Sequence, residues 1–481
     1  MRKSICLLPL AAALMLTGCV SLAPDYEQPQ APVAQAWPQD EATKNAVVLT
    51  EGLQQWGDFF TDPKLVALIE KGLENNRSLR SAIMAVEEAR AQYGVSRSQL
   101  FPSVAAVAEE TASRTPRSVN SAGRDVTSHV YSASLGMSSY ELDLFGRVRN
   151  LNEQALQAYF QTEAAQRTAQ MTVVTEIAST WLSLGAAKEQ LRLATSTYES
   201  QLESLELTKK SYELGASSQL DVQQALTTVA SAKTAQVQAM RAVSQYRNAL
   251  TLLVGDSVDA SLEPEGLVEN VTKTVSAASN IPSEVLLARP DIASAEAALR
   301  SANANIGVAR AAFFPSISLT GTFGTTSTEL SDLFGGGTRM WSFIPNITLP
   351  IFTGGANLQT LRAAEAAQKQ AVAEYELAIQ TAFKEVADAL ATEGTVADEL
   401  AATQELADAT AQSYKLSEDR YRNGMDSYLT VLDSQRSNFS AQQSLISAKL
   451  ARATSAVTLY KVLGGGSQLV QKEQENEAKA Q

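Results

Sequence analysis

The sequence predicts a mainly α-helical protein with a smaller β part, in which one unit of helix, β-hairpin, long helix and shorter helix occurs twice. Two ungapped blocks carry this duplication. Tyr212–Val222 aligns with Tyr421–Val431 at an offset of 209 residues, and Gly94–Ser103 aligns with Gly307–Ser316 at an offset of 213. Long proline-free segments and short runs of alternating polarity, both present in each half, are the other two observations behind this fold class.

Each half begins with a helix that ends before a Phe-Pro pair, where proline disfavours continuation. These helices are expected at about 62–100 and 283–312. A strand pair follows, because apolar Ile317, Leu319 and Phe323 alternate with serine and threonine. A soluble sandwich would show the same alternation. A membrane barrel also needs aromatic residues near the strand ends, and six residues are suitably placed: Tyr140, Phe145, Phe334, Trp341, Phe343 and Phe352.

Long helices are expected next, at 147–213 and 356–423, each about 100 Å long at 1.5 Å per residue. Apolar residues in the first of them repeat in steps of three, four and seven, which is typical of coiled-coil packing. Gly215 and Gly424 then reverse the chain into shorter helices at about 219–254 and 427–463, for which Ser218 and Ser427 are the expected N-caps.

The number of strands predicts an oligomer. Four strands cannot close around a lumen, and an open sheet edge cannot face lipid. Three protomers would supply 12 strands, which is wide enough for an open pore. The expected architecture is therefore a 12-stranded barrel in a homotrimer, continued by an α-helical coiled-coil barrel.

Composition excludes several functions. The chain of 481 residues has 39 Lys+Arg against 52 Asp+Glu, a formal net charge of −13, which argues against nucleic acid as a partner. A single histidine, His129, argues against histidine-based catalysis and multi-histidine metal sites, and we expect it to be a surface residue at a strand edge. No nucleotide-binding, hydrolase or zinc motif is present, so we expect no enzyme activity, metal or other cofactor.

The N-terminus resembles the signal of a bacterial lipoprotein. Arg2 and Lys3 precede the apolar run Ile5–Leu16, and Leu-Thr-Gly-Cys19 follows as a lipobox. Such a cysteine carries an N-acyl chain and an S-diacylglycerol lipid after cleavage, and Val20 in place of aspartate implies sorting to the outer membrane. The alternative is an ordinary signal peptide with an incidental cysteine.

Together these features resemble the outer-membrane factor family of TolC-type exit ducts, and the OprM-like lipoprotein branch most of all. Beside the lipobox, the resemblance is carried by Tyr140–Arg147, Ala311–Leu319 and Tyr428–Arg436. The family implies a homotrimer that serves an inner-membrane resistance-nodulation-division (RND) pump through a periplasmic adaptor, and that passes drugs and other small toxic compounds. Type I protein secretion is the alternative within this class, and a lipid-anchored periplasmic coiled-coil scaffold is the alternative outside it.

The predicted segments follow the duplication. They are the signal peptide (1–18), an acylated equatorial segment (19–61), a helix up to the barrel (62–102), β-hairpin 1 (103–145), helical hairpin 1 (146–254), an equatorial linker (255–282), a second helix up to the barrel (283–315), β-hairpin 2 (316–353), helical hairpin 2 (354–463), and an equatorial or disordered tail (464–481).

Candidate functional residues cluster beyond the second glycine turn. Leu429, Asp433 and Arg436 are spaced by four and three, so they share a helix face and would form apolar, acidic and basic rings in a trimer. The resemblance implies that these positions line the periplasmic constriction. The alternative is a solvated Asp–Arg pair worth a few tenths of a kcal/mol.

The other candidate sites depend more on the resemblance to this family. It implies a closing bond between Asp221 and Tyr421, although its supporting arginine is replaced here by Asp426. Adaptor contacts are expected around the Gly215 and Gly424 turns. Glu141 and Asp143 lie at a strand-to-helix junction, where they either face the lumen or are simply solvated.

Overall fold

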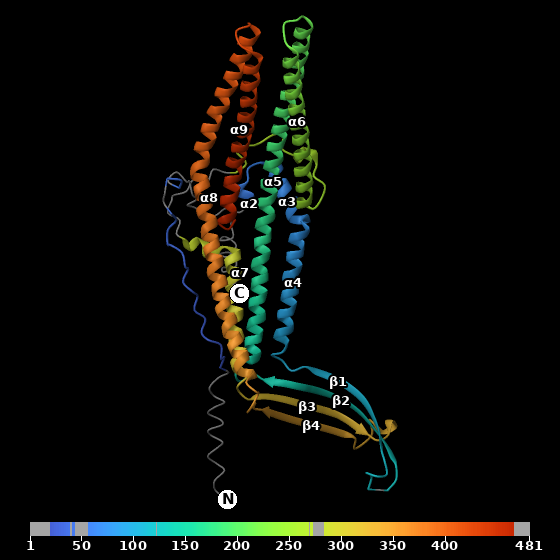
Figure 1. Cartoon of the computed structure of the whole chain (residues 1–481). Helices are drawn as coiled ribbons and strands as arrows, with labels where there is room; N and C mark the ends of the chain where they lie inside the picture. Colours follow the sequence, from blue (N-terminus) through green and yellow to red (C-terminus); the bar gives the residue numbers. More distant parts are fainter. Residues whose placement is uncertain are drawn as a thin grey trace. The chain divides into compact units, whose positions relative to one another are not determined.

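A computed structural model describes residues 20–38, 41–43, 56–121, 123–268, 270–272 and 283–465 (Figure 1). The predicted signal peptide, Cys19 and residues 466–481 lie outside these ranges. The chain divides into two compact units. Unit 1 contains the described parts of Met1–Gln30, Val86–Thr162 and Ala295–Tyr375, and unit 2 contains those of Ala31–Ala85, Glu163–Ser294 and Glu376–Gln481.

The long helices form where the sequence predicts them. They are α5 (Arg147–Glu213) and α8 (Ala356–Arg422), and each returns through a shorter helix, α6 (Gln219–Val254) or α9 (Tyr428–Val462). In unit 2, Figure 1 shows α6 beside α5 and α9 beside α8, which makes two helical hairpins. None of the helices in the described ranges has both the length and the hydropathy to cross a bilayer.

The prediction of one helix over 62–100 is wrong at Asn76. The structure has α3 (Pro63–Asn75) and α4 (Arg77–Ser98), because Asn76 adopts an extended backbone with ψ 125°. Its side chain accepts from the Leu79 amide at 2.9 Å and donates to the Leu253 carbonyl at 2.7 Å, so it caps α4 while binding α6.

The helix predicted from 283 also starts later. A 3₁₀ segment, η2 (Ser283–Ala288), precedes α7 (Pro290–Ala311), whose first residue is a proline with φ already suited to a helix N-terminus. Arg289 lies between them with 6% of its side chain exposed, and it binds Asp291 and Glu385 at 2.7 Å each. It also donates to the Val462 carbonyl at 2.8 Å, which ties the end of α9 to this corner.

Unit 1 contains one antiparallel sheet in the order β1-β2-β3-β4, which confirms the four predicted strands. Its strands are β1 (Val104–Thr115), β2 (Val126–Leu142), β3 (Ser316–Ser327) and β4 (Arg339–Thr348), with η3 (Leu330–Asp332) in the second loop. The β2–β3 pairing joins the hairpins of the two halves. Strands β1 and β4 form the two edges, and neither has a second partner within the described ranges.

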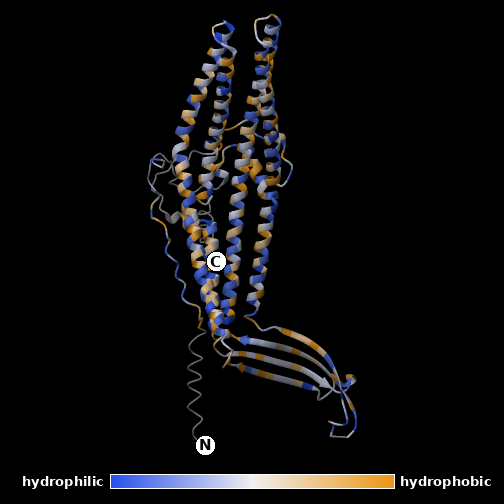
Figure 2. Ribbon diagram, viewed as in Figure 1, coloured by the Kyte–Doolittle hydropathy of each residue, from blue (hydrophilic) through white to orange (hydrophobic). Residues whose placement is uncertain are grey.

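The sheet has two chemically different faces. The register places Phe323 opposite Trp341 and Ile317 opposite Ile347, so these side chains share one face, and each of Phe323, Trp341 and Ile347 is more than 60% exposed. The other face carries serine and threonine, such as Thr322 opposite Ser342. Figure 2 shows this mixture of hydrophobic and hydrophilic positions along the strands.

The main core of unit 2 forms where α3, α5, α6 and α9 meet. Trp181 is 1% exposed and donates its indole N–H to the Leu262 carbonyl at 2.9 Å, next to η1 (Ala260–Leu262). Phe59, from α2 (Trp56–Phe59), stacks on Tyr460 at 4.3 Å between ring centroids. The segment before α3, the linker after α6 and the end of α9 therefore come together in this core.

The first described residues of the segment 19–61 belong to unit 1. Residues 20–26 run along unit 1 beside the start of α5 and the length of α7, and we call them the N-terminal strap. Asn303 donates to the Pro24 carbonyl at 2.8 Å, and Arg310 donates to the Leu22 carbonyl at 3.1 Å. An extended segment needs such partners for its backbone, and the sequence pattern gives no sign of where they are.

Candidate functional site

The two helical hairpins of unit 2 end in turns of the same design. Gly215 and Gly424 have φ of 73° and 71°, a region that favours glycine. In both turns the glycine amide bonds three residues back and the next amide bonds five residues back, at 2.8–2.9 Å. This is the Schellman motif, and it satisfies the last carbonyls of α5 and α8. The predicted glycine stops are confirmed at both turns.

The N-termini after the turns differ. Ser218 and Asp221 form a capping box, with 2.8 Å between the Ser218 amide nitrogen and the carboxylate. These bonds from Ser218 hold the pKa of Asp221 below its usual value. Ser427 is the N-cap residue of α9, as predicted, but its side chain makes no capping bond to the helix amides: its hydroxyl lies 3.1 Å from that of Thr430, the position that matches Asp221.

The second turn uses an ion pair instead. Arg420 binds Asp426 through two bonds of 2.6 and 3.0 Å and holds the pKa of that carboxyl below its usual value. The Asp426 carboxylate is therefore already paired within its own turn.

Below the turns, apolar residues hold the two hairpins together. This tip cluster consists of buried Leu205, Ala225, Tyr428 and Val431, with Val229, Tyr414, Tyr421 and Leu432 packed against them. The hydroxyls of Ser204 and Tyr428 are 3.1 Å apart, and the rings of Tyr421 and Tyr428 are 5.4 Å apart. Burial raises the pKa of Tyr421.

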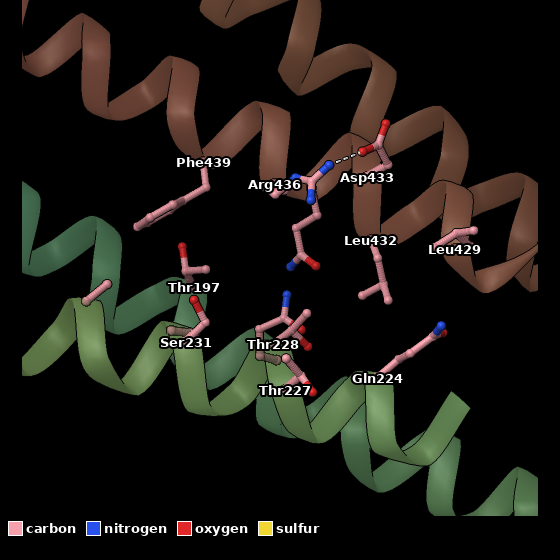
Figure 3. Close-up of a pocket in the computed structure, with 14 residues that line it drawn as sticks. Thr197, Gln224, Thr227, Thr228, Ser231, Leu429, Leu432, Asp433, Arg436 and Phe439 are labelled. Carbon is pink, nitrogen blue, oxygen red and sulfur yellow. Dashed lines mark hydrogen bonds and ion pairs between the residues drawn. The ribbon is translucent and has the colours of Figure 1, made fainter. Parts of the chain in front are cut away.

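A groove of about 350 Å³ lies between the two hairpins beside this cluster (Figure 3). Polar residues of α5 and α6 line one wall, and α9 supplies the other. The lining is Thr197, Gln201, Gln224, Thr227, Thr228, Ser231, Ala232, Ala235, Leu429, Leu432, Asp433, Gln435, Arg436 and Phe439. We call it the α6–α9 groove.

All three predicted gate residues line this groove. Asp433 and Arg436 form an ion pair of 2.5 Å, with 66% and 82% of their side chains exposed, and Leu429 is 61% exposed. Leu429 and Asp433 also line a second groove between α8 and α9. They therefore stand on a ridge of α9 with open space on both sides, so a neighbouring chain or a solute can reach them.

The Asp221–Tyr421 bond stays a prediction. Among the described residues of the single chain, the Asp221 carboxylate is used by Ser218, and its hydrogen bonds do not include Tyr421. Asp221 lies near enough to contribute to the raised pKa of Tyr421.

Glu141 and Asp143 are not simply solvated. Glu141 binds Arg147 through bonds of 2.8 and 2.5 Å, and Asp143 accepts from the Arg149 amide at 2.8 Å. Asp143 is 12% exposed, and its other carboxylate oxygen is buried without a hydrogen bond. Both acids tie the end of β2 to the first turn of α5. His129 pairs with Glu110 at 2.9 Å and is 46% exposed, as expected for a surface position.

Sequence reasoning missed the partners of the predicted residues. Thr227, Thr228 and Ser231 form the hydroxyl-rich wall of the groove, and Phe439 closes one end of its lining. Their spacing of one to four along α6 resembles that of any solvated helix face, so only the position of α9 opposite them marks them as part of the site.

A family model described as "Outer membrane efflux protein" matches residues 68–256 and 281–465 of the chain. It matches twice, once in each half, in agreement with the internal duplication. The two matches together include both glycine turns and all three gate residues.

Individual relatives match over nearly the whole chain. A probable efflux pump outer membrane protein, TtgC of Pseudomonas putida, is 45% identical over 469 residues, covering 97% of this chain and 96% of its own. Outer membrane protein OprJ of Pseudomonas aeruginosa is 42% identical, covering 95% of both. The open-state structure of the Neisseria gonorrhoeae MtrE outer membrane channel superimposes with a TM-score of 0.82 at 38% identity, covering 93% of this chain and 98% of its own.

Proposed function

The chain belongs to the outer membrane efflux protein family, and on this premise we propose that it is the outer-membrane exit channel of an efflux pump. It resides in the outer membrane and conducts drugs and other small toxic compounds passively out of the cell. Its relatives carry names of efflux pump outer membrane proteins, including pumps for antibiotics and toluene. The cargo class of this chain is inferred from them.

The observation that carries this proposal is the sheet with two open edges. Among the described residues, strands β1 and β4 have no partner on their outer sides, and the backbone groups there cannot face lipid unpaired. Closure by two further copies gives a 12-stranded barrel in a homotrimer, and α5 and α8, each of 67 residues, continue it as a helical tunnel. The apolar face of the sheet then contacts outer-membrane lipid and the serine-rich face lines the lumen.

The partners follow from the same family membership. A periplasmic adaptor contacts the glycine turns, where Leu214 and Met425 are 85% and 60% exposed, and an inner-membrane RND pump supplies the cargo. The lipid on Cys19 anchors the chain. The strap supports this anchoring role, because Arg149 at the start of α5 donates to the carbonyl of Val20, the residue that follows Cys19 in the sequence. A passive duct of this kind needs no enzyme activity.

The gate is formed by the ridge of α9. Three copies of Leu429 form an apolar ring that hinders water and ions, and three Asp433–Arg436 pairs form charged rings beside it. Neutralising one member of the pair removes a charged ring and frees its partner, which loosens the closed state.

The test measures Asp433→Ala and Arg436→Ala trimers in planar bilayers, and the sensitivity of cells that carry them to large antibiotics. Higher conductance and higher sensitivity are expected. Asp388→Ala is the matched control, because Asp388 belongs to an equally exposed pair with Lys384 away from the turns. If both gate variants conduct like Asp388→Ala, the gate assignment is wrong, and if neither the wild type nor the gate variants conduct, the channel itself is refuted.

A further inference from the structure

Unit 1 contains a second cavity, at the end of the sheet where the strands meet the helices. It measures about 320 Å³, and we call it the junction pocket. It lies among the end of β2, the start of β3, the end of β4 and the end of α7. Its lining is Glu141, Leu142, Asp143, Leu144, Phe145, Arg147, Ala311, Ala312, Phe314, Pro315, Ser316, Thr348 and Pro350.

The register shows which face of the sheet the pocket adjoins. Glu141 pairs with Ser318, and Ser316 pairs with Thr348, so three of the lining residues in strands lie on the serine- and threonine-rich face, while Leu142, opposite Ile317, lies on the apolar face. That is the face assigned to the lumen by the proposed function. The junction pocket therefore opens on the path of the cargo, where the barrel passes into the tunnel.

The apolar part of the pocket is suited to a flat molecule. The rings of Phe145 and Phe314 stack, with their centroids 4.7 Å apart and an angle of 24° between their planes. Phe314 is 42% exposed although it is a large apolar side chain, so part of its ring surface is available to a ligand. Leu142, Leu144 and the two prolines enclose the remaining sides. Offset stacking on such a surface contributes about 0.5–1.5 kcal/mol for an aromatic ligand.

The charged part of the pocket favours a cation. The carboxylates of Glu141 and Asp143 and the guanidinium of Arg147 line it. Each carboxylate is paired with an arginine, Glu141 with Arg147 and Asp143 with Arg149, and Glu141, with 24% of its side chain exposed, can also reach a bound cation. A positively charged group beside the Phe145 and Phe314 rings gains from their negative faces as well.

We propose that the junction pocket binds planar aromatic cations as they pass through the channel. This inference rests on the proposed function and adds to it a cargo class and a binding site in unit 1. The pocket is half open and the ligand shares it with an existing ion pair, so binding is brief, as a duct requires.

The test records single trimers in planar bilayers while ethidium, a planar aromatic cation, is present on one side. Brief current interruptions are expected, with a dwell time that falls about 2- to 10-fold in Phe314→Leu when the stacking surface is lost. The duplication supplies the matched control. Phe101 occupies the same Phe-Pro position in the first half, is 64% exposed and lies outside the pocket lining, so Phe101→Leu should behave as wild type.

A second variant tests the charge. Glu141→Gln should shorten the dwell time of ethidium but leave that of the uncharged N-phenyl-1-naphthylamine unchanged. The proposal is overturned if Phe314→Leu and Phe101→Leu give equal dwell times, or if Glu141→Gln affects both probes alike. A trimer that conducts ions without interruption by ethidium overturns the pocket alone, whereas the absence of current in both the wild type and the Asp433→Ala gate variant overturns the proposed function.

Discussion

Gly307 in α7 should be required for the N-terminal strap to pack against α7. The duplication provides a control for this prediction, because Gly94 is the matching residue of the first half. Gly307 and Gly94 occupy the same position in the two halves, and both lie inside helices. A Cβ at Gly307 would lie 2.8 Å from the Ala23 amide nitrogen and 2.4 Å from the Asn150 side-chain nitrogen, whereas a Cβ at Gly94 would meet nothing within 4 Å. The same substitution therefore has opposite expected effects at the two sites.

The size of the effect can be worked from these contacts. Replacing glycine by alanine inside a helix normally stabilises it by about 0.5–1 kcal/mol, and Gly94→Ala should show this gain. At Gly307 the clash involves strap backbone, which cannot rotate away. The strap must shift, which breaks the Ser21–Asn150 bond of 2.9 Å and weakens its neighbours. Each lost bond costs about 1 kcal/mol, so the strap should open roughly tenfold more often for every 1.4 kcal/mol lost.

Amide hydrogen exchange of residues 20–30, followed by mass spectrometry, measures this opening directly. Exchange in the strap should be at least several-fold faster in Gly307→Ala and unchanged in Gly94→Ala. Equal exchange in the two variants would refute the reasoning that Gly307 is required by the close approach of the strap.

Three further predictions concern unit 2. Tyr428→Ala empties the centre of the tip cluster, which should cost about 3–5 kcal/mol of stability and speed amide hydrogen exchange in both turns. Tyr212→Ala, at a 44% exposed tyrosine of the first turn, should do neither. Equal exchange in the two variants would contradict the cluster's role. Glu263 is 5% exposed, and Arg247 and Lys188 lower its pKa to about 2 against burial. The stabilisation from the ionised Glu263 carboxylate is therefore present above about pH 4.5 and lost as pH falls towards 2. Glu263→Gln should lower the stability by up to about 3 kcal/mol at pH 7, and the two proteins should become equally stable near pH 2. Thermal unfolding followed by circular dichroism measures this difference. A constant difference at all pH values would contradict this assignment. Gly424→Ala should destabilise its turn by about 1–2 kcal/mol because φ is 71°, seen as faster exchange in 420–430, and a silent substitution would show that the turn relaxes.

Local patterns predicted the elements that depend on neighbours in sequence. The alternation of Ile317, Leu319 and Phe323 is a property of a strand with one apolar face, and the register confirms it. The stop at Gly424 likewise depends on one residue's backbone freedom. The break at Asn76 was missed because asparagine in a helical pattern is ambiguous until its side chain finds the Leu253 carbonyl of α6.

The candidate site was predicted as one face of one helix. Leu429, Asp433 and Arg436 lie on that face as their spacing requires, since helical periodicity alone fixes it. Their surroundings were not predictable, because Thr228 and Ser231 come from α6, about 200 residues earlier, and nothing local selects them.

By itself, the sequence determined the duplication, the long helices with their glycine turns, four strands with one apolar face, and the order of all these parts, because each depends on periodicity or on the backbone of a single residue. Tertiary structure alone decided which side chains meet. It placed the strap against Gly307, paired Glu141 with Arg147 beside two stacked phenylalanines, and set the hydroxyls of α6 opposite Asp433. These contacts join residues distant in the chain, and their free energies depend on distances of a few ångströms that no local pattern encodes.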